Sequence, residues 1–255
     1  MLKNKLLVAA LASSFALPVM AADFTPSSNV SLVSDYLYRG ISQTGAGAAI
    51  QGGFDLAHAS GLYIGAWGSS ISWLGDAGIA ANAGVANAGL ELDTYGGYKG
   101  ALSDVSYDVG FLRYNYPGTY AAGITKADTN EIYGALTYSI VTAKLSYSLG
   151  DLFGLSNAKG STYLEVNASY PIADTGVTIG AHYGKQAYKG STADGYKNAG
   201  ADPTYADYKL SVSKDFSGYV VGLTASSTNA SSFYTNVQGK KLGKGTAVLS
   251  LSRSF

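Results

Sequence analysis

The chain has 255 residues with 17 basic and 17 acidic side chains, no cysteine, 33 glycines and 21 tyrosines. The lack of cysteine excludes a disulfide scaffold and a cysteine-ligated metal site, and the even charge gives no electrostatic reason to expect a nucleic-acid partner. Charged residues make up only 13% of the sequence, whereas soluble domains carry about a quarter. Such a composition suits a wall with lipid outside and a polar lumen inside.

The N-terminus has the layout of a secretory signal peptide. Lys3 and Lys5 provide a positive region, residues 6–17 are apolar, and Val19-Met20-Ala21 forms a small-residue cleavage site. We therefore predict a cleaved signal peptide over residues 1–21 and a single domain over residues 22–255. No later apolar run is long enough for a membrane helix, so the exported chain is either a soluble periplasmic protein or a β-barrel of the outer membrane.

Alternation of side chains with a period of two recurs along the rest of the chain and predicts β-strands. In residues 61–73, for example, Leu62 and Ile64 share one face while Tyr63 and Trp67 share the other. The predicted strands are 29–38, 49–58, 61–73, 89–99, 104–114, 130–140, 142–150, 161–170, 176–186, 205–214, 218–228 and 245–255. An even number of strands brings both termini to the periplasmic side of a bacterial outer-membrane barrel.

The connections between these strands alternate between long and short. The long ones are 39–48, 71–88, 115–129, 151–160, 187–204 and 229–244, and the short ones are 59–60, 100–103, 141, 171–175 and 215–217. Outer-membrane barrels have long extracellular loops and short periplasmic turns, whereas a soluble sandwich has no reason to sort its connections. The predicted fold class is an all-β transmembrane antiparallel β-barrel of 12 strands.

Aromatic residues gather near both ends of the predicted strands and suggest two interfacial girdles. The periplasmic group is Tyr98, Tyr138, Tyr170, Phe216, Tyr219 and Phe255. The extracellular group is Tyr38, Trp73, Tyr114, Tyr133, Tyr163 and Tyr205.

Three segments near the start of the predicted barrel carry a resemblance to a known family. They are Ser34-Asp35-Tyr36-Leu37-Tyr38-Arg39-Gly40-Ile41-Ser42-Gln43, then Ile50-Gln51-Gly52-Gly53-Phe54-Asp55, and then residues 60–69. Together they resemble the TorF-like porin family of proteobacteria, with departures at Ala48, where the family has proline, and at Ser70, where it has asparagine. The resemblance implies a β-barrel and pore in the outer membrane.

The C-terminal strand ends on Phe255 after alternating apolar residues. This ending looks like the signal that the barrel assembly machinery recognises in outer-membrane proteins. Arg253 interrupts the apolar face, and we expect it to extend its charged end to the interface.

Charged residues on the polar face of the strands are candidates for lining a pore. They are Asp35, Asp55, Glu91, Asp93, Asp108, Glu131, Glu165 and Asp207 among the acids, with Lys99, Lys144, Lys209 and His182. An excess of acids favours cations in a pore and predicts a mild cation preference. The alternative is that these charges neutralise one another and rigidify the wall.

We find no motif for catalysis, a cofactor or a metal in the sequence. His58 and His182 are the only histidines, and neither has the sequence context of a catalytic or metal-binding residue. Segment 78–89 is expected to be a surface loop, although an inward fold is an alternative. Loop lysines such as Lys240 and Lys241 make lipopolysaccharide a plausible neighbour.

The sequence therefore predicts an outer-membrane, porin-like channel for ions or small hydrophilic solutes, without enzymatic activity. The alternative is a structural or interaction barrel with a closed lumen, whose loops bind lipopolysaccharide or a partner protein.

Overall fold

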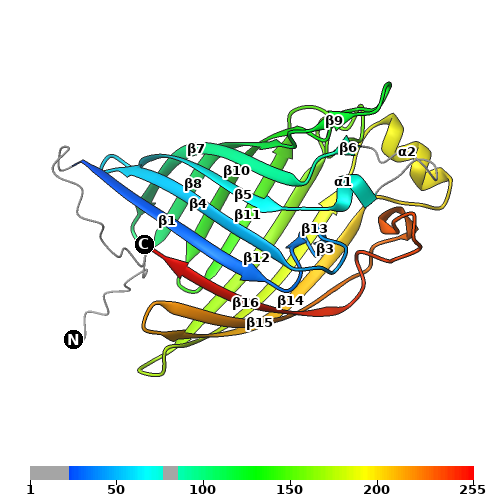
Figure 1. The fold of residues 1–255 in the computed structure, drawn as a ribbon. Helices are drawn as coiled ribbons and strands as arrows, with labels where there is room; N and C mark the ends of the chain where they lie inside the picture. The colour runs from blue at the N-terminus through cyan, green and yellow to red at the C-terminus, as the bar shows by residue number, and fades with distance from the viewer. Residues whose placement is uncertain (1–22, 77–85) are drawn as a thin grey trace.

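The computed structural model describes residues 23–76 and 86–255, and twelve of its strands form a closed antiparallel barrel (Figure 1). Each strand pairs with the next one along the chain, and β1 pairs with β16 to close the ring. This confirms the predicted fold class. The strands of the barrel are β1 (Phe24–Val33), β4 (Ala49–His58), β5 (Leu62–Ser70), β7 (Leu90–Leu102), β8 (Val105–Asn115), β10 (Thr129–Tyr138), β11 (Val141–Ser148), β12 (Thr162–Ile172), β13 (Val177–Ala187), β14 (Tyr205–Phe216), β15 (Tyr219–Thr228) and β16 (Thr246–Ser254). The predicted signal peptide and residues 77–85 of the predicted second loop lie outside the described residues.

The outer surface of the barrel is apolar because side chains alternate between the two faces of each strand. On β14, Leu210 is 67% exposed, whereas Asp207 and Lys209 on the opposite face are buried or half-buried. Ile64 on β5 and Leu136 on β10 are exposed in the same way. An apolar band that runs around a whole barrel is a surface adapted to lipid.

The two ends of the barrel differ. The short turns 59–61, 103–104, 139–140, 173–176 and 217–218 lie at one end, called here the turn end, where β1 begins and β16 finishes (Figure 1). The backbone N–H of Phe255 donates to the carbonyl of Ser28 at 2.8 Å, so the chain is paired to its last residue. Arg253 lies over the rings of Tyr219 and Phe255, which shields its apolar stem at this rim.

The long connections lie at the opposite end, called here the loop end, and they contain the remaining elements. Among the described residues, no helix is long and apolar enough to cross a membrane. The elements at the loop end are β2 (Leu37–Tyr38), β3 (Ile41–Ser42), α1 (Trp73–Asp76), β6 (Ala86–Asn87), β9 (Thr119–Tyr120), α2 (Ser191–Asn198) and η1 (Ser232–Tyr234).

The prediction for the first strand was wrong in its position. The strand was expected at residues 29–38, but β1 runs from Phe24 to Val33 and pairs along its whole length with β4, from Phe24 opposite His58 to Val33 opposite Ala49. Because β4 begins at Ala49, residues beyond Val33 have no partner in the ladder with β4. The chain therefore leaves the wall, and residues 34–48 turn into the barrel.

The predicted aromatic girdles are confirmed at one end only. At the turn end, Tyr98, Tyr138, Tyr170, Phe216 and Tyr219 are exposed on the outer surface. At the loop end, Tyr114, Tyr163 and Tyr205 are buried, because each occupies a position whose side chain points to the lumen. Height along the strand was predicted correctly for these residues, but the face was wrong.

Candidate functional site in the barrel lumen

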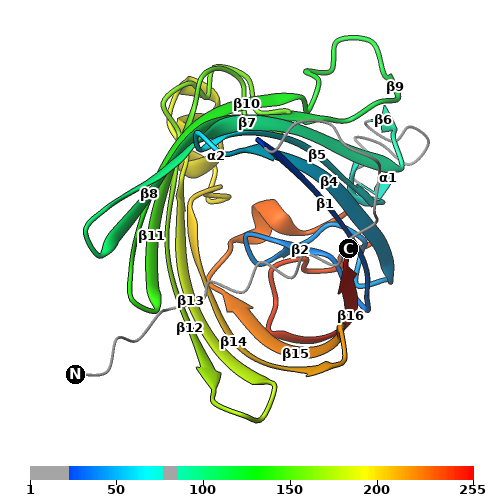
Figure 2. The ribbon, with the colours of Figure 1, turned by 90° about the vertical axis from the view of Figure 1, so that its left-hand side faces the viewer.

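Residues 34–48 form a hairpin inside the barrel, called here the inner hairpin. Its two short strands pair Leu37 with Ser42 and Tyr38 with Ile41, so Arg39 and Gly40 form the tip. Both tip residues have positive φ, 46° and 78°, as a two-residue type I′ turn requires. Viewed from the turn end, β2 lies within the ring of strands (Figure 2).

Arg39 joins the tip of the inner hairpin to the far wall. Its guanidinium donates to Oε2 of Glu131 on β10 at 2.8 Å and to Oε1 of Gln186 on β13 at 2.6 Å. It also lies over the ring of Tyr163, 4.3 Å from its centre. Burial acts to lower the pKa of Arg39, but Glu131, Tyr38 and Tyr114 together outweigh it and raise the pKa, so the side chain remains charged.

The rest of the inner hairpin contacts other parts of the wall. The hydroxyl of Tyr36 donates to Oε1 of Glu91 on β7 at 3.2 Å, and that of Tyr38 donates to the hydroxyl of Tyr114 on β8 at 2.7 Å. A Cβ at Gly40 would lie 2.7 Å from side-chain carbons of Asp207 on β14 and Thr228 on β15. The inner hairpin therefore reaches at least eight of the twelve strands of the barrel: β5, through the ring of Trp67 against Tyr36, and β7, β8, β10, β12, β13, β14 and β15.

Neighbouring loops hold the base of the inner hairpin. The backbone N–H of Ser42 donates to the carbonyl of Leu242 at 2.9 Å, and that of Ser72 donates to the carbonyl of Gln43 at 2.9 Å. Lys240 donates to the carbonyl of Gly45. The hairpin is thus fixed by backbone contacts to two other long connections as well as by its tip.

The predicted pore-lining acids fall into two groups, the first of which is buried beside the inner hairpin. The buried acids are Asp35, Glu91, Asp93, Glu131 and Asp207. Asp35 lies on the inner hairpin itself, not on a wall strand as expected, and accepts from Ser42 Oγ at 2.6 Å. Burial raises its pKa, against the hydrogen bonds from Ser42 and Thr44.

Glu91 and Asp93 differ from the other buried acids because each has one carboxylate oxygen without a hydrogen-bond partner among the described residues. They lie two residues apart on β7, so their side chains share the inner face. Arg39 pairs with Glu131 instead. This part of the lumen therefore holds uncompensated negative charge when both acids are ionised.

The second group of predicted residues is half-buried and lies on the inner wall away from the hairpin tip. Asp55 accepts from the hydroxyl of Tyr95 at 2.7 Å, and Asp108 accepts from the hydroxyl of Tyr63 at 2.6 Å. Lys144 lies 4.5 Å from the centre of the Tyr133 ring. The two hydrogen bonds each join strands two places apart in the ring, and the contact of Lys144 with Tyr133 joins adjacent strands. All three therefore run along the wall.

His182 is the centre of a wall network that includes Asp207 of the first group and two other predicted residues, Glu165 and Lys209. Its Nε2 lies 2.9 Å from Oδ2 of Asp207, and its Nδ1 lies 2.6 Å from Oδ1 of Asn167. Glu165 accepts from Asn167 at 3.0 Å, and Lys209 lies 3.8 Å from Asp207. Among the described residues, no group of three or more histidines and acids has an arrangement that could hold a metal ion.

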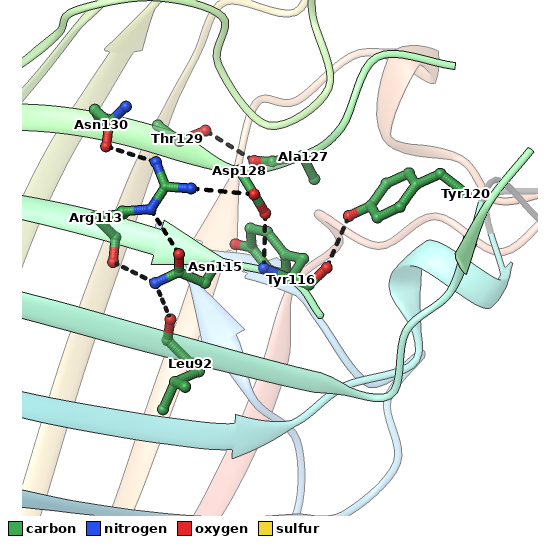
Figure 3. A network of polar contacts seen from close by, with 9 residues as sticks. All are labelled: Leu92, Arg113, Asn115, Tyr116, Tyr120, Ala127, Asp128, Thr129 and Asn130. Atoms are coloured by element: carbon green, nitrogen blue, oxygen red, sulfur yellow. Dashed lines mark hydrogen bonds and ion pairs between the residues drawn. The ribbon is translucent and has the colours of Figure 1, made fainter. Parts of the chain in front are cut away.

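A polar network secures the loop-end rim between β8 and β10 (Figure 3). Arg113 Nη2 donates to Oδ2 of Asp128 at 3.3 Å, while Oδ1 of Asp128 accepts from the backbone N–H of Tyr116 at 2.9 Å. The hydroxyl of Tyr120 donates to the carbonyl of Tyr116 at 3.3 Å. The network ties the two ends of connection 116–128 together and holds Tyr116, which is buried.

Arg39 and Gln186 were missed as functional residues by the sequence analysis. The alternation of residues 29–38 predicts a strand that ends at Tyr38, so Arg39 is expected at the start of a long connection. Two signals point to it in retrospect. The first is that Arg39-Gly40 separates two short segments that each contain an apolar residue, Leu37-Tyr38 and Ile41-Ser42, as the tip of a hairpin does. The second is that the eight predicted inner acids faced only three lysines, so a further inner cation was to be expected.

The fold is similar to that of known membrane proteins. A chain from a structure described as "Unveiling the Mechanism Behind the in-meso Crystallization of Membrane Proteins" aligns with 6% identity and a TM-score of 0.50, over 90% of this chain and 83% of the other. An outer membrane channel from Pseudomonas putida F1 aligns with 14% identity and a TM-score of 0.48, over 94% and 97%. OprD of Pseudomonas aeruginosa aligns with 14% identity and a TM-score of 0.39, over 92% and 66%.

No curated protein matches the sequence. A family model described as "Bacterial protein of unknown function (Gcw_chp)" matches residues 19–255. The chain therefore belongs to the Gcw_chp family.

Proposed function

We propose that the protein is a porin-like channel of the outer membrane whose conductance is limited by the inner hairpin. The observation that carries the proposal is the contrast between the two faces of the wall: the outside is apolar and exposed, while the inside is lined with acids, lysines and tyrosines. A polar lumen within an apolar barrel is the arrangement of a porin. The resemblance to TorF-like porins agrees with this function.

Ions and small hydrophilic solutes are the proposed cargo, with a mild preference for cations. The eight inner acids face Arg39, Lys99, Lys144 and Lys209, which leaves an excess of four negative charges when all acids are ionised. Fields in a narrow lumen are poorly screened by a low-dielectric wall, so this excess favours cations. The loop end would face the cell exterior and the turn end the periplasm.

A closed barrel with a structural or interaction role is the second candidate, and the inner hairpin is the observation that favours it. The hairpin contacts at least eight of the twelve strands from inside. If it leaves no path for water, the loop end would serve only as a binding surface.

Single-cysteine labelling separates the two candidates, because the native chain has no cysteine. Lys144→Cys places a thiol on the inner wall, and Leu145→Cys places one on the outer, exposed face of the same strand. In liposomes, a charged methanethiosulfonate reagent should modify Lys144→Cys and leave the lipid-facing Leu145→Cys unmodified. Planar-bilayer recordings should show discrete conductance steps that the reagent reduces in Lys144→Cys. No steps and no labelling of Lys144→Cys would refute the channel and support the closed barrel.

A further inference from the structure

A cavity of about 730 Å³ lies among the long connections, with Arg39 of the inner hairpin in its lining. The lining includes residues from all six long connections: Ser42, Trp73, Thr125, Phe153, Tyr188 and Phe233 are examples. Cavities of this size, about 300–1,000 Å³, are typical of sites for small molecules.

Aromatic rings form much of the lining. Nine of the lining residues are tyrosine, phenylalanine or tryptophan. Several of them fix one another by edge-to-face contacts: Trp73 with Tyr116 at 5.6 Å between ring centres, and Tyr196 with Phe233 at 5.0 Å. A set of rings held in place by such contacts presents large apolar surfaces at little entropic cost.

The cavity carries almost no free charge. Among the described residues that line it, Arg39 is the one charged side chain, and its charge is compensated by Glu131 at 2.8 Å. The remaining polar groups of the lining are uncharged hydroxyls and amides, such as those of Gln43, Thr192 and Asn236. An ion that enters this cavity would lose hydration without gaining an opposite charge.

One polar group of the lining lacks a partner. The indole Nε1–H of Trp73 is buried and donates to no acceptor among the described residues. An unsatisfied buried donor costs free energy, about 1–3 kcal/mol in proteins. An acceptor on a bound molecule would remove this cost once the indole turns its N–H toward the cavity.

We propose that this cavity binds small uncharged aromatic molecules that carry a hydrogen-bond acceptor. The rings of the lining select an aromatic body, the lack of free charge selects against ions, and Trp73 selects an acceptor. The site deepens the proposed function, because it adds a class of solute for the channel. Binding requires only the cavity, whereas passage of the bound molecule through the barrel rests on the proposed function.

Benzamide is a suitable probe, because it is uncharged, aromatic and carries a carbonyl acceptor. Its binding to the full-length protein in lipid nanodiscs is measured by calorimetric titration, which requires no conductance and so does not depend on the channel being open. Cyclohexanecarboxamide keeps the acceptor without the ring, while benzoate and benzylammonium keep the ring and add a charge. We expect benzamide to bind about three- to tenfold more tightly than the cyclohexane analogue, as for an aromatic contact, and more tightly than either ion.

Two pairs of variants locate the site. Trp73→Phe removes the donor and keeps a ring, so it should weaken benzamide binding about fivefold, whereas Trp67→Phe, outside the cavity lining, should leave it unchanged. Tyr196→Ala removes a ring of the lining, and its control Tyr138→Ala removes an exposed ring at the turn end. Folding of all four is checked by the resistance of the barrel to unfolding in detergent at low temperature.

The proposal is overturned if the cyclohexane analogue binds as tightly as benzamide, or if benzoate or benzylammonium binds more tightly. It is also overturned if methyl glucoside, an uncharged sugar, binds more tightly than benzamide. An equal loss of benzamide affinity in Trp73→Phe and Trp67→Phe would likewise contradict binding in this cavity. Absence of conductance with benzamide binding intact would refute the channel and keep the site.

Discussion

Arg39 and Glu131 form a buried ion pair at 2.8 Å although 92 positions separate them in the sequence. Arg39 follows β1, and Glu131 lies on β10, five places away around the twelve-stranded ring. The pair therefore crosses the lumen. Both side chains are at most 5% exposed, so neither charge can be satisfied by bulk water if the other is removed.

Replacing Arg39 with alanine should destabilise the barrel and loosen the inner hairpin. Loss of one partner of a buried ion pair costs about 3–5 kcal/mol, because the other charge stays buried and unpaired. The free energy of unfolding, measured by denaturant titration in lipid vesicles, should fall by about this amount, and single-channel conductance should rise. Unchanged stability and conductance would show that the ion pair holds nothing in place.

Arg113→Ala is the matched control for Arg39→Ala. Arg113 also pairs with an acid, Asp128 at 3.3 Å, but its side chain is 40% exposed at the rim. Exposed ion pairs contribute about 0–1 kcal/mol. The double variant Arg39→Ala with Glu131→Gln should recover part of the loss, because it removes the unpaired charge as well.

Gly40→Ala should disturb the tip of the inner hairpin. The new Cβ would lie 2.7 Å from carbons of Asp207 and Thr228, and φ is +78°. Gly239→Ala separates these causes, since Gly239 has φ of +77° with nothing within 4 Å of the new Cβ. Backbone strain alone costs about 1–2 kcal/mol, so Gly40→Ala should cost clearly more than Gly239→Ala. Equal costs would mean that the tip has room to move away from the wall.

Arginine on the outer surface should report the depth of a residue in the membrane. Leu210, in the middle of β14, is 67% exposed, and Leu102, the last residue of β7, is 78% exposed. Arginine costs about 2–4 kcal/mol at the bilayer midplane and about 0–1 near the interfaces. The free energy of unfolding in lipid vesicles should therefore fall more in Leu210→Arg than in Leu102→Arg. Two small and equal effects would contradict a lipid-facing wall.

Neutralising the unpaired acids should change ion selectivity without loss of stability. In Glu91→Gln with Asp93→Asn, the excess of inner negative charge falls, so reversal potentials under a potassium chloride gradient should show a weaker cation preference. Stability should stay level or increase, because the two buried carboxylates with unpartnered oxygens disappear. Asp194→Asn on α2 is the control, since Asp194 is exposed and salt screens charges beyond about 10 Å. A wild-type pore that prefers anions would contradict the role given to these acids.

Most of the wall was predictable from the sequence, because a strand with lipid on one side and water on the other must alternate its side chains. β4 was predicted with its observed bounds, Ala49–His58, and the even strand count followed from the same alternation. Alternation alone could not show that β1 ends at Val33. Residues 34–38 continue the pattern, and only the length of β4 decides where pairing stops.

The inner hairpin was not predictable from local patterns, because its partners lie far away in the sequence. Tyr114 and Tyr163 were placed at the correct height but on the wrong face, since tyrosine suits both a membrane interface and a polar interior. Glu131 was predicted to line the lumen, whereas its partner Arg39 was not. The position of a loop side chain depends on the closed barrel around it.

The contacts of the inner hairpin also impose an order on assembly. The hairpin joins β1 to β4, at the start of the chain, while its partners come from β5 through β15. Glu131, Gln186 and Thr228 reach their places around the tip only when the later strands have been added to the ring. The hairpin must therefore settle after the wall around it exists, and an unfinished barrel would expose the charge of Arg39 to water. The ring of Trp67 packs edge-on against Tyr36 of the hairpin, with 5.6 Å between ring centres. Its fluorescence should therefore report when the hairpin docks against the wall.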